Sequence, residues 1–75
     1  MVEFQTIAAE HVPFGSRNFI EVARKKAVEE ERENVFISIS RGFFGQDGNK
    51  RYKQNVTVPL DPNVIDFISK KIREI

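Results

Sequence analysis

The stretch from Asn34 to Leu60 constrains the fold most, because it has the pattern of a β-hairpin with two different faces. Residues Val35–Phe44 and Lys50–Leu60 flank the turn sequence Gln46-Asp47-Gly48-Asn49, and Asp-Gly is a strong hairpin signal. Successive side chains of a strand point to opposite faces. The apolar face is predicted to hold Val35, Ile37, Ile39, Val56 and Val58. The opposite face is predicted to hold Phe36, Ser38, Ser40, Phe44, Arg51, Lys53, Asn55 and Thr57.

The C-terminal segment has the pattern of an amphipathic helix. Asp61 is a good N-cap residue and Pro62 suits the first helical position. One apolar stripe at helical spacing consists of Val64, Ile65, Ile68, Ile72 and Ile75. We expect this stripe to cover the apolar face of the sheet or to pair with a second subunit. The residues expected to be buried together are Ile37, Val56, Ile68 and Ile72.

Residues 17–33 are ambiguous. Ser16 can cap a helix, and residues 27–33 have high helix propensity. Apolar residues recur there at roughly helical spacing, namely Phe19, Ile20, Val22, Ala23, Ala27 and Val28. Against this, Ile20 and Val22 alternate with their neighbours as in a strand that runs into an acidic loop. The pattern alone slightly favours a helix, while residues 2–9 read as a short strand and residues 11–16 as a turn or loop.

Length and composition limit the classes of protein. Seventy-five residues predict a single domain, 1–75, with a limited core. The chain has no cysteine, so it has no disulfide, and it has no apolar run near the ~20 residues of a membrane span. We therefore expect a cytoplasmic protein without membrane contact. The net charge is only +1, but basic residues gather in 17–26 and 34–60, where a local stripe can bind phosphates.

Catalytic patterns are weak. His11 is the only histidine, and no Asp or Cys is placed in the sequence to complete a triad with it and Ser16. The glycine-rich residues 42–48 match neither a phosphate-binding loop nor a dinucleotide fingerprint. The acidic residues 29–33 lack the spacing of a calcium loop. We expect no enzyme activity, no cofactor and no metal.

The order of strands and helix resembles that of a known family. The chain has a basic strand at Phe19–Lys26, a hydrophobic strand at Val35–Phe44, a strand closing in Asn55–Pro59 and a terminal helix. In that order, from about Phe14 to Ile72, it resembles the positive-cofactor-four family of transcriptional coactivators, whose domain binds single-stranded DNA. The resemblance implies a strand at 18–26 and therefore an α+β fold, with a four-stranded antiparallel sheet followed by a C-terminal amphipathic helix. The alternative is a β-α-β-β-α order with a helix at about 17–33. Two features depart from the family, an acidic loop at 27–34 that is longer than its usual tight turn and the segment before Phe14.

The expected function is non-catalytic binding of single-stranded DNA or RNA in transcription or genome maintenance, by a homodimer or higher oligomer. Lys and Arg would neutralise phosphates and aromatic rings would stack on bases. The resemblance implies contacts from Arg24, Lys26, Arg41, Phe44, Arg51 and Lys53. Phe36 and Tyr52 are further stacking candidates, although strand alternation puts Tyr52 on the apolar face. The alternative is a structural or protein-interaction module that forms a homo-oligomer through its sheet and helix.

Overall fold

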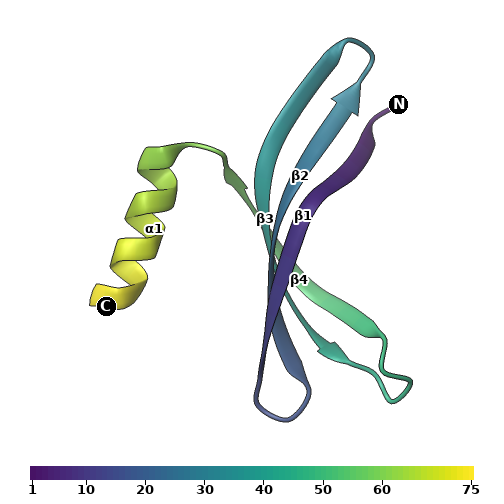
Figure 1. Ribbon diagram of the computed structural model, residues 1–75, viewed down its shortest axis with the longest axis vertical. Coiled ribbons are helices and arrows are strands. Elements are labelled where there is room, and N and C mark those ends of the chain that lie inside the picture. Colours follow the sequence, from purple (N-terminus) through teal and green to yellow (C-terminus); the bar gives the residue numbers. More distant parts are fainter.

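Four antiparallel strands and one helix make up the fold, which the computed structural model describes for residues 1–75 (Figure 1). The elements are β1 (Glu3–Phe14), β2 (Asn18–Glu29), β3 (Arg32–Phe44), β4 (Lys50–Pro59) and α1 (Pro62–Glu74). The strands pair in chain order, β1-β2-β3-β4, so that β1 and β4 are the two edges. The expected α+β class, with a four-stranded antiparallel sheet followed by a C-terminal helix, is confirmed.

The alternative with a helix at 17–33 is wrong, because Asn18–Glu29 forms the second strand. This strand has a partner on each side, and pairing along two edges outweighs a weak helix propensity. The expected loops are also shorter than predicted. β1 continues through Phe14, and only residues 30 and 31 separate β2 from β3, with Glu30 in the left-handed conformation at φ 50°. The acidic segment is therefore a tight turn and not the longer loop expected at 27–34.

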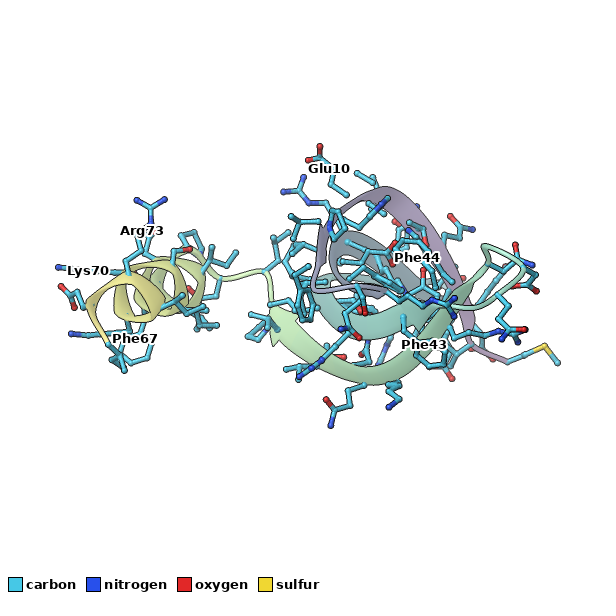
Figure 2. The ribbon with its side chains drawn as sticks, turned by 90° about the horizontal axis from the view of Figure 1, so that it is seen from below. Glu10, Phe43, Phe44, Phe67, Lys70 and Arg73 are labelled. Atoms are coloured by element: carbon cyan, nitrogen blue, oxygen red, sulfur yellow. The ribbon has the colours of Figure 1, made fainter.

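The sheet is strongly curved, and its two faces are named here from its register. The concave face carries Phe4, Thr6, Ala9 and His11 of β1; Phe19, Glu21, Ala23 and Lys25 of β2; Phe36, Ser38, Ser40, Gly42 and Phe44 of β3; and Lys50, Tyr52, Asn55 and Thr57 of β4. The convex face carries the side chains between them. Curvature brings the edges together, since Lys50 Nζ on β4 lies 3.3 Å from His11 Nδ1 on β1. Figure 2 shows Phe44 within the curve and Glu10 outside it.

Burial on the sheet differs from the prediction. Phe19, Ser38, Ala23 and Ser40 on the concave face are 0 to 5% exposed. On the convex face Val58 is buried, but Val56 is 60% exposed and Val22 is 47% exposed. The prediction that this apolar hairpin face forms the core is confirmed for Val58, while Val35, Ile37 and Ile39 are half-buried and Val56 is exposed in the single chain. Small side chains on the concave face let the sheet curve inward, and this curvature covers the concave face instead.

Helix α1 stands clear of the sheet, and Figure 1 shows it joined to the sheet only through the end of β4. The Asp61 carboxylate accepts a hydrogen bond from the Asn63 backbone N–H at 2.9 Å, as expected of an N-cap. The prediction that Ile68 and Ile72 pack on Ile37 and Val56 is wrong for the single chain, because Ile72 is 74% exposed. No helix in the structure is long and apolar enough to cross a membrane.

A β-bulge in the hairpin changes which side chains share a face. The register shifts after Arg41, so that Arg41 pairs with Gln54 but Gly42 pairs with Tyr52, and Lys53 is the extra residue. As a result Arg51 pairs with Phe43, on the convex face, and the prediction that Arg51 shares a face with Phe44 is wrong. The prediction that Tyr52 lies on the apolar face is wrong for the same reason.

Candidate nucleic-acid interface

A groove of about 480 Å³ lies on the concave face between the edge strands, within the usual size range of ligand sites. All four strands contribute to it. Its lining residues are Thr6, Ala9, Glu21, Ala23, Lys25, Ser40, Tyr52, Lys53, Gln54 and Asn55. We call it the concave groove. It has a polar wall of hydroxyl, amide and ammonium groups, and Glu21 is the only acid among the lining residues.

The carboxylate of Glu21 is held by two partners. Lys50 Nζ donates to Glu21 Oε1 at 2.8 Å, and the Tyr52 hydroxyl donates to Oε2 at 2.9 Å. The hydrogen bond from Lys50 is the main cause that lowers the pKa of Glu21, against the opposing effect of burial. Glu21 is therefore ionised at neutral pH and its charge is balanced by Lys50. The concave groove presents no unpaired negative charge to a ligand.

The Glu21 contacts predict a loss of stability in acid. A carboxyl whose pKa is lowered by folding stabilises the protein above its unfolded pKa, about 4.3, and this contribution is lost as the pH falls through the folded value. Glu21→Gln removes this titration. Thermal melts between about pH 6 and about pH 3 should show a smaller decrease in Tm for the variant than for the parent chain. Equal decreases would show that the Glu21 contacts add nothing in solution.

Hydrogen-bonding groups line the groove beside this ion pair. The Asn55 side-chain nitrogen donates to the hydroxyls of Ser38 and Ser40, the latter at 2.7 Å. These two bonds fix the orientation of the Asn55 side-chain amide. Its side-chain oxygen, Oδ1, accepts no hydrogen bond from the protein. Lys25 lies across from Phe36 and Thr6 and forms no ion pair. An acceptor and a cation are therefore available at the groove wall.

Aromatic clusters stand at both ends of the concave face. At one end the rings of Phe4 and Phe36 meet edge to face, with centroids 6.3 Å apart. At the other end Phe19 contacts Phe44 at 5.1 Å and Tyr52 at 5.4 Å. Phe4 is 66% exposed and Tyr52 is 56% exposed, so each end offers an accessible ring. Phe36 and Phe44 lie eight residues apart on β3, roughly 26 Å at the rise of a strand.

The structure separates the residues predicted to form the site. Phe36 and Phe44 lie on the concave face, both half-buried. On the convex face lie Arg24, Lys26, Arg41 and Arg51. Two of these cations already have acidic partners, since Lys26 pairs with Glu33 at 3.4 Å and Arg51 pairs with Asp47 at 3.5 Å. Lys53 occupies the bulge and borders the groove. Nucleic-acid binding by these seven residues stays a prediction.

Sequence reasoning missed several groups of the concave groove. Lys25 stands between Arg24 and Lys26 in the sequence, and only the pairing register shows that it is the one of the three on the concave face. Tyr52 was a stacking candidate, but its position on the concave face follows from the bulge and was not predicted. Phe4 and Thr6 belong to a strand whose partner was not predicted. The only sequence signal for these two residues was the short strand predicted at residues 2–9.

Comparisons with protein-family models, with curated proteins and with solved structures return no match to this chain. The functional assignment therefore depends on the residues and their geometry.

Proposed function

We propose that this chain binds single-stranded nucleic acid, DNA or RNA, in the concave groove without catalysing a reaction. One observation carries the proposal. A polar groove with its sole carboxylate neutralised lies between two aromatic clusters, each with an accessible ring. Stacking of bases on aromatic side chains beside cations that contact phosphates is how single strands are bound with little sequence preference.

Each part of the groove suits a part of the ligand. Tyr52 and Phe4 offer ring faces to unstacked bases, while Lys25 in the groove and Lys53 at its β4 edge neutralise phosphates. Asn55 accepts a hydrogen bond from a base or sugar. A duplex keeps its base faces inside the stack, so aromatic platforms select single strands. The resemblance to the positive-cofactor-four family supports the same ligand, and on that ground we propose a role in transcription or genome maintenance.

Substitutions at the groove should separate stacking from charge. Tyr52→Leu keeps apolar bulk against Phe19 and should cost about 1–3 kcal/mol of binding with an unchanged salt slope. Lys25→Gln should reduce the slope of log affinity against log salt by about one. The assay is fluorescence anisotropy of a labelled oligothymidylate at several salt concentrations.

Lys70→Gln is the matched control for charge, because Lys70 is exposed on α1 far from the groove and forms no ion pair. It should leave affinity and slope unchanged. If the parent chain binds no single strand even at low salt, the proposal is wrong. If Lys70→Gln acts as strongly as Lys25→Gln, binding is a general property of the basic surface.

We also propose that the chain assembles as a homodimer through its helix and convex face. On α1, Phe67 is 63% and Ile72 is 74% exposed, and in one row of the convex face Val22 is 47% and Val56 is 60% exposed. Exposed apolar surfaces of this kind mark interaction sites. A second copy supplies the matching surface for each, as a two-fold axis requires. The concave groove stays open in this arrangement.

The helix gives a direct test of assembly. Phe67→Asp places a charge in the proposed interface and should convert a dimeric mass, measured by light scattering at micromolar concentration, into a monomeric one. Ser69→Asp adds the same charge on the polar side of α1, where Ser69 lies with Asp66, Lys70 and Arg73, and should leave the dimer intact. A monomeric mass for the parent chain would contradict the dimer.

A further inference from the structure

Two cation–aromatic pairs lie on the convex face near the β3–β4 turn. The Arg41 guanidinium carbon is 5.4 Å from the centroid of Phe14, and Lys53 Nζ is 5.6 Å from the centroid of Phe43. Neither Arg41 nor Lys53 forms an ion pair with an acidic group. Phe14 is 39% exposed, so this ring is accessible from solvent. An exposed ring beside an unpaired cation has the same chemistry as the ends of the concave groove.

Lys53 connects these pairs to the concave groove. It is the extra residue of the bulge on β4, which is an edge strand with no neighbour beyond it. It borders the groove on one side of the strand while its ammonium lies over a ring on the other side. Bulges commonly redirect side chains at sheet edges. At this point the basic and aromatic groups of the two faces meet at a sheet edge.

We propose that a bound single strand leaves the concave groove over the β4 edge at Lys53 and continues onto Arg41 and Phe14 on the convex face. This inference rests on the proposed function and extends it, because it sets the path and the length of the ligand. The exposed apolar residue Val56 lies further along β4, beyond Gln54, the partner of Arg41. The path therefore stays beside the surface proposed for the dimer.

The path predicts an affinity that depends on oligonucleotide length. Oligothymidylates of increasing length should bind weakly while they fill only the groove, and then more tightly once they reach the convex face. Arg41→Gln and Phe14→Leu should leave the affinity of the shortest binding oligonucleotide unchanged. For the longer ones each should lower affinity roughly ten-fold, the effect of about one stacked base. Arg24→Gln is the control, since Arg24 is an exposed convex-face cation beside Ile37, away from the path.

The outcomes separate the two proposals. If no oligonucleotide binds at any length, the proposed function fails and this inference fails with it. If short ones bind but Arg41→Gln and Phe14→Leu follow the parent chain at every length, the function stands and the path is wrong. The path is also wrong if Arg41→Gln weakens binding of the shortest oligonucleotide. It is wrong as well if Arg24→Gln lowers the affinity for long oligonucleotides as much as Arg41→Gln does. Circular dichroism of each variant verifies that the sheet is intact.

Discussion

Replacing Phe19 with alanine should lower the free energy of unfolding by about 3–5 kcal/mol, the cost of removing a buried phenylalanine. Phe19 is 0% exposed and is the largest fully buried side chain in the protein. Its ring contacts those of His11, Phe44 and Tyr52, with centroids 5.1 to 6.2 Å away. Its loss would leave a cavity under the aromatic end of the concave groove. Urea denaturation followed by circular dichroism measures the change.

The size of this effect matters because the whole domain has little stability to lose. At ~0.05–0.15 kcal/mol per residue, a chain of this length has roughly 4–11 kcal/mol. The alanine variant should therefore be partly unfolded at moderate temperature. Phe19→Leu keeps most of the apolar volume and should lose much less. An alanine variant that unfolds at the same urea concentration as the parent chain would show that the curved sheet in solution does not bury this ring.

Replacing Gly42 with alanine should also destabilise the fold, by about 1–3 kcal/mol or more, as overpacking does. A Cβ at this position would collide with the Arg51 backbone carbonyl and would lie 2.8 and 2.9 Å from two atoms of the Phe19 ring. Gly42 follows the register shift and pairs with Tyr52. The carbonyl belongs to the partner strand, so relief of the clash requires the hairpin to separate. Thermal melting of the variant measures the effect.

Gly45→Ala is the matched control in the same hairpin. Its Cβ would approach Asp47 Oδ1 at 3.0 Å and Arg51 Nε at 3.3 Å. These atoms are the ends of exposed, flexible side chains that can move aside, so the control should melt close to the parent chain. If Gly42→Ala were equally mild, the bulge register would be different from the one described.

The sequence predicted the elements better than their packing. The alternation in 35–44 and the Asp61-Pro62 start signal correspond to β3 and to α1 as observed. The curvature was not predictable from alternation, which identifies two faces but not which one is buried. Here Ala23, Ser38 and Ser40 line the covered side because small side chains allow it to close. The direction in which α1 leaves the sheet is set by the short link between Pro59 and Pro62. Hydrophobic periodicity predicts the helix but not its direction.

The candidate site shows the same limit. Phe36 and Phe44 lie on the concave face as the alternation predicted. A bulge adds one residue and reverses the faces on one side of it relative to the other, so Arg51 and Tyr52, just before Lys53, exchange faces relative to a regular strand continued from Asn55. No residue pattern in 50–55 identifies the bulge. At the register shift Gly42 is packed against both the partner strand and Phe19, which are tertiary contacts that a local pattern does not contain.

A nuclear magnetic resonance titration tests binding in the concave groove most directly. ¹⁵N-labelled protein is titrated with oligothymidylate at low salt, and the side-chain amides of Asn55 and Gln5 are followed. Asn55 lines the groove, whereas Gln5 lies on the convex face of β1, paired with Lys26. Binding in the groove predicts large shifts for the Asn55 side-chain amide and the Tyr52 backbone amide, with little change at Gln5. Shifts at Gln5 with none at Asn55, or no shifts at all, would contradict it.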